Sequence, residues 1–158
     1  EFATLDHELQ LIKSYLEIEK ARFEERLRVS VNVPDELQIL EIPTLILQPL
    51  VENAIKHGIS AKKRGGEIAI RASVEREDDQ EYLCITVSDT GDGAALLERP
   101  ESRGVGLRNI EDRLRSYYYG EARLELYRHR NDETRAVIAI PMARVRGESR
   151  MRKEVAII

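Results

Sequence analysis

The chain has 158 residues, which suits one domain, since domains usually run to about 100–200 residues. Apolar residues make up 42% of it, enough for an ordinary single core, and charged residues make up 34%. The net charge of −4 gives no reason to expect nucleic acid or an anionic membrane as a partner. The longest apolar stretch, Ile39 to Val51, is interrupted by polar residues and prolines, and it falls short of the roughly 18 residues that a membrane span needs.

The single cysteine, Cys84, cannot form a disulfide within the chain, and it lies in a strand-like run where a buried, inert thiol is expected. One unpaired thiol fits a reducing cytoplasm. The sequence shows no signal peptide and no initiator methionine. We therefore expect a cytoplasmic fragment of a longer protein, and the sequence leaves open whether that protein is anchored in the inner membrane.

Apolar residues recur at helical spacing from Thr4 to Leu27, which predicts one amphipathic helix. The stripe consists of Leu5, Leu9, Ile12, Leu16, Phe23 and Leu27. Thr4 can cap the helix, and the acidic residues Asp6 and Glu8 suit its positive end. Alternation from Leu27 to Val33 then predicts a strand.

A second helix is expected around Leu50–His57, because Pro49 fits a first helical turn and Gly58 fits the left-handed position just past a helix end. Two alternating runs follow, Glu67–Glu75 and Tyr82–Asp89, joined by a polar turn. They predict an antiparallel hairpin.

A third helix is expected from about Leu107 to Tyr118, ended by Gly120, and a second hairpin is formed by Ala122–Arg128 and Thr134–Pro141. Strands adjacent in sequence are not separated by helical crossovers in this order. The pattern predicts an α+β two-layer sandwich, with a mixed, mostly antiparallel sheet and helices on one face.

Three segments carry residues suited to chemistry, and the first lies in the second helix. Asn53, Lys56 and His57 stand at i, i+3 and i+4, so an α-helix would place them on one face. An amide oxygen suits Mg²⁺, which keeps most of its shell as water and phosphate oxygens, and lysine suits a phosphate. Polar faces of surface helices often look like this, so the trio alone is weak support for a site.

The second segment, Asp89–Gly93, follows a strand directly. Gly91 and Gly93 allow close backbone approach to a ligand, and the Asp89 carboxylate can accept a hydrogen bond from an exocyclic amine. The alternative is an ordinary turn. Against it, the polar segment that continues to Arg103 is longer than usual connections, and long loops in compact domains are often functional.

The third segment, Arg103–Asn109, places Gly104 and Gly106 at the start of a helix, where backbone N–H groups and the helix dipole attract phosphate. The preceding strand and third glycine of a dinucleotide fold are missing, as is the Gly-Lys-Ser/Thr of a P-loop. Both of those folds are therefore disfavoured.

In this order and spacing, the three segments resemble the N, G1 and G2 boxes of the GHKL superfamily, which contains histidine kinases, gyrase-type topoisomerases, heat-shock-90 chaperones and MutL proteins. LQPLVENAIKHG, VSDTGDG, GVGLRNIEDRL and the N-terminal LDHELQLIKSYLEIEKARFEERL are similar to sensor histidine kinases of the LytS/YehU type. The resemblance covers about Leu5 to Pro141, nearly the whole chain.

The resemblance implies a Bergerat α/β sandwich that binds ATP and Mg²⁺. It implies that Asp89 binds the adenine amino group, that Gly91 and Gly93 contact the base and sugar, and that Asn53 holds Mg²⁺. Lys56 and His57 would face the phosphates or ribose.

In the same family, Gly104 and Gly106, with Val105 between them, would close over the triphosphate, and Leu107 would pack near the adenine. The segment 94–103 would form the ATP lid. Thr134 sits where the family often has a threonine near the adenine-binding aspartate, although Glu133 replaces the glycine that usually precedes it.

One departure from the superfamily concerns ATP hydrolysis. GHKL enzymes that hydrolyse ATP carry a glutamate four residues before the helix asparagine, and here that position is Pro49, which cannot act as a base. Glu52 is expected on a different face from Asn53. The resemblance therefore implies a histidine protein kinase domain that holds ATP for an external nucleophile.

The phosphoacceptor motif of the family is absent from the sequence, since His57 belongs to the N box and we expect His7 and His129 to be exposed bystanders. We expect residues 1–27 to link to an upstream phosphoacceptor helical domain, residues 28–142 to bind ATP, and residues 143–158 to form a charged tail. A response regulator would receive the phosphoryl group, and a membrane-bound, dimeric parent is left open. Two alternatives also stay open: a GHKL-type ATPase or chaperone, and a non-catalytic nucleotide-sensing module.

Overall fold

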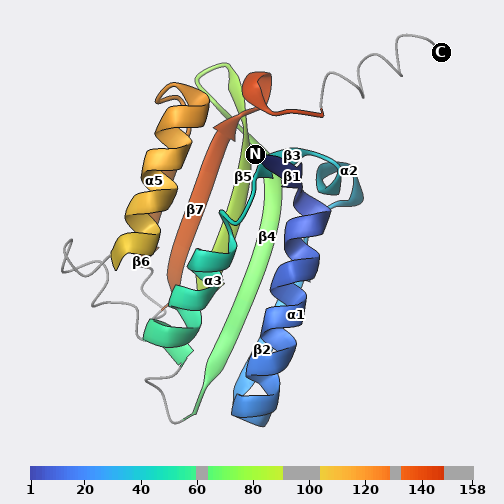
Figure 1. Cartoon of the computed structure of the whole chain (residues 1–158), viewed down its shortest axis with the longest axis vertical. Helices are drawn as coiled ribbons and strands as arrows, with labels where there is room; N and C mark the ends of the chain where they lie inside the picture. The colour runs from blue at the N-terminus through green and yellow to red at the C-terminus, as the bar shows by residue number, and fades with distance from the viewer. Residues whose placement is uncertain (60–63, 91–103, 129–132, 148–158) are drawn as a thin grey trace.

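The computed structural model describes residues 1–59, 64–90, 104–128 and 133–147. Its main sheet has five strands: β2 (Leu27–Asn32), β4 (Gly66–Glu77), β5 (Gln80–Asp89), β6 (Arg123–Arg128) and β7 (Thr134–Pro141). They lie in the order β2-β4-β5-β7-β6, with β2 parallel to β4 and every other pair antiparallel. Three helices, α1 (Leu5–Phe23), α3 (Gln48–Asn53) and α5 (Gly104–Tyr118), cover one face of this sheet (Figure 1). The predicted two-layer sandwich is confirmed.

Helix α1 begins where the sequence predicts, because the Thr4 side chain accepts a hydrogen bond from the His7 backbone N–H at 3.2 Å. Its predicted apolar stripe is buried: Leu5, Leu9, Ile12, Leu16 and Phe23. The α-helix ends at Phe23, four residues earlier than predicted, and a 3₁₀ turn, Glu24–Arg26, leads into β2. Glu24 has a φ of 56°, which turns the chain away from the helix axis.

Three short elements were not predicted: strands β1 (Phe2–Thr4) and β3 (Glu41–Pro43), and the one-turn helix α2 (Asp35–Gln38). Segments of three or four residues are too short to show a periodic pattern. The two strands pair antiparallel as a separate two-stranded sheet, which places the start of the chain beside the segment that leads into α3.

Both hairpins are confirmed, and the first is longer than predicted. The turn between β4 and β5 has Asp78 and Asp79 at φ 48° and 66°, the positive values that a two-residue hairpin turn of type I′ requires. Helix α5 begins at Gly104, three residues earlier than predicted, and Gly120 follows it in the left-handed conformation, with φ 80°.

Helix α3 departs from its predicted form. It starts at Gln48 with Pro49 in its first turn, as expected, but it ends at Asn53 and continues as a π-helical turn, η2 (Ala54–Ile59). Gly58 lies inside this turn and is not among the glycines with positive φ, so the prediction that it ends the helix in a left-handed conformation is wrong. π-helical turns are rare and often lie at functional sites.

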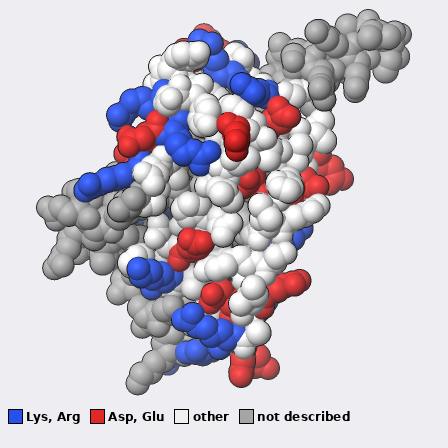
Figure 2. Space-filling model, in the orientation of Figure 1, with Lys and Arg blue, Asp and Glu red and all other residues white. Residues whose placement is uncertain are grey.

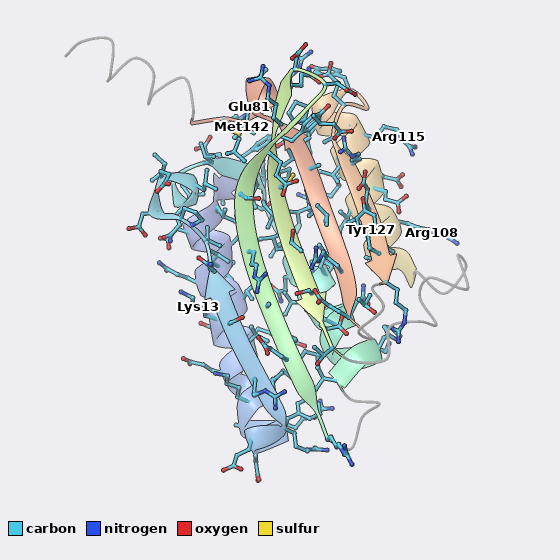
Figure 3. The ribbon with its side chains drawn as sticks, turned by 180° about the vertical axis from the view of Figure 1, so that it is seen from behind. Lys13, Glu81, Arg108, Arg115, Tyr127 and Met142 are labelled. Atoms are coloured by element: carbon cyan, nitrogen blue, oxygen red, sulfur yellow. The ribbon has the colours of Figure 1, made fainter. Side chains whose placement is uncertain are left out.

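The helices and the inner face of the sheet enclose one hydrophobic core. The outer face of the sheet is turned away from the helices (Figure 3). Cys84 lies among polar and charged side chains that include Glu75, Arg123 and Glu125. Cys84 is a buried free thiol, and burial chiefly raises its pKa to about 11, which agrees with the predicted inert cysteine. Within the described ranges, no helix combines the length and the apolar character needed to cross a membrane.

Candidate functional site

Four segments with predicted site residues meet at one end of the main sheet (Figure 1). They are the turn η2, the last residue of β5, the first residue of β7 and the first turn of α5. Contacts of η2 with β4 and β5, and of α3 with α5, hold these segments together. The structure therefore brings segments that are far apart in the sequence, from η2 (Ala54–Ile59) to the start of β7 at Thr134, to one end of the sheet.

Asp89 and Thr134 form the sheet side of the site. They are Cα partners across β5 and β7, and each is only 6% exposed. Arg128, the last residue of β6, donates a hydrogen bond from Nη1 to Thr134 Oγ1 at 3.3 Å. A carboxylate accepts hydrogen bonds only, so this strand end suits a ligand group that donates them, as an exocyclic amine does.

Thr90, whose side chain is not predicted from the sequence to bind a ligand, is part of the framework of the site. Its N–H donates to the Glu67 carbonyl oxygen at 3.2 Å, and the Glu67 N–H donates to Thr90 Oγ1 at 3.0 Å. A Cβ on Gly66 would lie 2.7 Å from Thr90 Oγ1 and 2.8 Å from Ile59 Cδ1, so any larger residue would have to displace these side chains. The paired bonds fix the end of β5 against β4 and so orient Asp89. The available signal in the sequence was the glycine pair Gly65-Gly66 at the start of β4.

Asn53, Lys56 and His57 form the helix side. Asn53 is the last residue of α3 and is partly exposed, while Lys56 is exposed and His57 partly exposed in η2. Because a π-helix bonds i to i+5, the α-helical spacing that predicted a shared face does not apply beyond Asn53. Burial lowers the pKa of His57, and the positive charge of Lys56 acts in the same direction. His57 is therefore a neutral hydrogen-bonding group at neutral pH, beside a lysine charge.

The first turn of α5 contains Gly104, Val105, Gly106 and Leu107. The first N–H groups of an α-helix have no partner within the helix, and the helix dipole makes this end attractive to anions. A Cβ on Gly106 would lie 3.7 Å from Pro49 Cβ, so the first turns of α5 and α3 are in contact. Leu107 is 1% exposed and belongs to the hydrophobic core.

Basic side chains gather over α5 on the helix face of the molecule (Figure 2). Arg108 is exposed and lies toward the end where α5 begins, and Arg115 lies toward the other end (Figure 3). Arg108 is not one of the site residues predicted from the sequence, and it adds a positive charge near the candidate phosphate site. Gly91 and Gly93, with the predicted lid at 94–103, lie outside the described residues.

Residues 40–144 match the family model described as "Histidine kinase-, DNA gyrase B-, and HSP90-like ATPase". The chain is 37% identical to the sensor histidine kinase YesM of Bacillus subtilis over 144 residues, and 35% identical to the sensor histidine kinase BtsS of Escherichia coli over 143. Each match covers 89% of this chain and 24% of the relative, so the chain spans about a quarter of those proteins. The predicted resemblance to sensor kinases of the LytS type is confirmed.

Solved structures agree on the fold. The histidine kinase domain of the Erythrobacter litoralis EL346 blue-light activated histidine kinase superposes with a TM-score of 0.64 at 24% identity, covering 89% of this chain and 62% of that one. The catalytic domain of the histidine kinase ThkA gives a TM-score of 0.62 at 14% identity, covering 89% and 95%. The match of residues 40–144 shows that the chain belongs to the family of histidine kinase-, DNA gyrase B- and HSP90-like ATPases.

Proposed function

We propose that this domain binds ATP with Mg²⁺ and transfers the γ-phosphate to a histidine on a separate helical segment of its parent protein. The observation that carries the proposal is the meeting of Asp89 and Thr134, the turn after Asn53 and the first turn of α5 at one end of the sheet. The names of YesM and BtsS support kinase activity for proteins that contain a domain of this kind.

Recognition of adenine would fall to the sheet side of the site. The buried Asp89 carboxylate accepts a hydrogen bond from the exocyclic amine, and the Thr134 hydroxyl lies opposite it in the strand pair. Gly91 and Gly93, next along the chain, would contact the base and sugar through their backbone.

The phosphates of ATP would lie between the end of α3, with the turn η2 that follows it, and the start of α5. Backbone N–H groups of Gly104, Val105 and Gly106 at the start of α5 offer donors without helical partners, and Lys56 offers a point charge. Leu107, the next residue, packs into the hydrophobic core and so anchors the first turn of α5. His57, with its lowered pKa, would serve the phosphates or ribose as a neutral donor.

Asn53 would hold the Mg²⁺. Its partly exposed amide at the end of α3 provides the kind of hard oxygen ligand that Mg²⁺ accepts beside water and phosphate oxygens. When bound there, Mg²⁺ would supply positive charge that offsets the negative charge of the phosphates.

Two residues favour a kinase over a hydrolase. Pro49, in the first turn of α3, has no group that could activate water, and its ring lies against Gly106. Glu52 is exposed, and its Oε1 accepts a hydrogen bond from Gln48 Nε2 at 3.1 Å on the same helix. The bound ATP would therefore await a nucleophile brought by another segment.

The test is phosphoryl transfer in trans. The whole chain is incubated with Mg²⁺, ATP labelled at the γ-phosphate and a separately made phosphoacceptor segment of the parent. Label should appear on that segment as an acid-labile, alkali-stable phosphohistidine, and an aspartate of the parent's response regulator should then accept it. Steady phosphate release without an acceptor would favour the ATPase alternative. Tight ATP binding with neither outcome would favour a nucleotide-sensing module.

A further inference from the structure

A buried glutamate connects α1 to the loop that begins α3. Glu8 is 1% exposed, and its Oε1 accepts a hydrogen bond from the Leu45 backbone N–H at 3.0 Å. Its other oxygen, Oε2, is buried and has no hydrogen-bond partner within the described part of the chain. Carboxylates are rarely buried this completely, since removing them from water is costly. An apolar residue at this position of α1 would avoid that cost, so the carboxylate needs a reason other than packing.

The group that Glu8 holds is a strained one. Leu45 has a φ of 55°, a left-handed conformation that residues other than glycine rarely adopt. Its side chain is 53% exposed, so burial of the leucine does not explain this conformation. The next two residues, Ile46 and Leu47, are fully buried, and the Leu47 carbonyl oxygen accepts the N–H of Leu50 in the first turn of α3. The left-handed residue thus directs the chain into the core and into the helix.

The same turn of α3 lies beside the first turn of α5, which contains Gly106 of the candidate site. Leu45, Pro49 and Gly106 line one concave surface of about 300 Å³ between the start of α3 and α5. Because Pro49 is in contact with the position of Gly106, the path of the loop at Leu45 sets how α3 lies against the first turn of α5. Helix α3 ends at Asn53, the proposed magnesium ligand.

We propose that Glu8 is a positioning residue for the nucleotide site. Its hydrogen bond keeps Leu45 left-handed, and this holds α3, with Asn53 at its end, at the spacing from α5 that ATP requires. The proposal rests on the proposed function, since it assumes that ATP binds between these helices. A position on α1 far from any nucleotide would then control nucleotide affinity.

Two substitutions of Glu8 test the bond. Glu8→Gln keeps an oxygen that can accept from the Leu45 N–H, and the ATP Kd, measured by calorimetry with Mg²⁺ on the whole chain, should stay within about twofold of wild type. Glu8→Leu removes the acceptor with little change of volume, and the Kd should rise about tenfold. Equal Kd values for wild type and Glu8→Leu would overturn the proposal.

A matched control separates positioning from loss of stability. Leu16 lies on the same helix, is 2% exposed, and is roughly 12 Å from Glu8 at 1.5 Å per residue. Leu16→Ala should lower the melting temperature and leave the ATP Kd within about twofold of wild type at a temperature where it is folded. A rise in Kd as large as that of Glu8→Leu would show that any weakening of α1 has this effect, and would overturn the proposal.

Substitutions of Leu45 test the same link without touching the core. Glycine adopts a positive φ at no steric cost, so adding Leu45→Gly to Glu8→Leu should restore the Kd to within about threefold of wild type. Valine opposes this conformation, so Leu45→Val alone should weaken ATP binding about as much as Glu8→Leu. If Glu8→Leu does not fold, the comparison of Leu45→Val with Leu45→Gly decides, and equal Kd values overturn the proposal.

These outcomes are distinct from failure of the proposed function. If the wild-type chain does not bind ATP at all, the proposed function fails. If wild type binds ATP and the variants of Glu8 and Leu45 bind it equally well, the proposed function stands and the positioning role of Glu8 is wrong.

Discussion

Asp89 and Thr134 face each other across β5 and β7 with both side chains buried, although 44 residues separate them in the chain. Asp89 is the last residue of β5, and Thr134 is the first residue of the neighbouring strand β7. The pair therefore lies at the end of the sheet. Water has little access to either side chain, so a hydrogen bond from a ligand to this pair would be stronger than the same bond on an exposed surface.

Replacing Asp89 should separate binding from folding. Asp89→Asn removes the charge and turns part of an acceptor-only group into a donor, so ATP affinity should fall about tenfold or more while the melting temperature changes little. Isothermal calorimetry and thermal denaturation measure the two effects. Asp112→Asn on the exposed side of α5 is the matched control, because its 3.9 Å contact with Arg115 is a surface ion pair. An unchanged Kd in Asp89→Asn would reject the adenine-binding role.

Asn53→Ala should reduce the dependence of ATP binding on Mg²⁺. Alanine removes the proposed oxygen ligand, so adding Mg²⁺ should tighten ATP binding less in the variant than in wild type. The measurement is the ratio of ATP Kd values with Mg²⁺ and with a chelator. Gln48→Ala, which removes another amide from α3, should keep the wild-type ratio. If Asn53→Ala also keeps it, Asn53 is not a magnesium ligand.

Thr90→Val should loosen the end of β5. The variant removes the Oγ1 acceptor that satisfies the Glu67 N–H, which should cost about 0.5–1.5 kcal/mol of the free energy of unfolding. ATP affinity should also fall, because Asp89 loses part of its support. Thr90→Ser retains the hydroxyl and should stay close to wild type in both measurements. Identical unfolding curves for the valine and serine variants would show that the hydrogen bond from the Glu67 N–H to Thr90 Oγ1 contributes nothing to stability.

The lowered pKa of His57 should make the free energy of unfolding depend on pH. Its pKa is lowered in the folded state, so the unfolded chain takes up the proton first as the pH falls. Stability should be fully present above the unfolded pKa of about 6.5 and should fall as the pH drops through the lower folded value. Thermal denaturation across this range should show a shallower decline for His57→Asn than for wild type.

The cause of the His57 shift can be tested separately. Burial is the larger cause and Lys56 the smaller, so Lys56→Met should move the pKa of His57 upward without returning it to the ordinary value. Titration of the His57 ring by NMR reports this directly. A return to the ordinary value in Lys56→Met would mean that charge, not burial, sets the pKa.

The sequence by itself determined most of the elements and the family. Period-3.6 and period-2 patterns depend on neighbours a few residues away, so α1, both hairpins and the α+β sandwich could be predicted locally. Pro49 in the first turn of α3 and Gly120 after α5 could also be predicted, because the backbone preferences of proline and glycine do not depend on a distant partner. The short strands β1 and β3 escaped because three residues carry too little pattern.

Only the tertiary structure decided which distant residues meet. Strand register and helix packing set three relationships in this structure. They are the pairing of Asp89 with Thr134, the hydrogen bonds between Thr90 and Glu67, and the hydrogen bond from the Leu45 N–H to Glu8. Register and packing depend on which segments bury their apolar faces against one another across the whole core. The periodic pattern of one segment therefore does not specify which distant residues it will contact. The sequence predicted an α-helix through His57 for the same reason. The structure has a π-helical turn there, and this turn packs against β4 and β5.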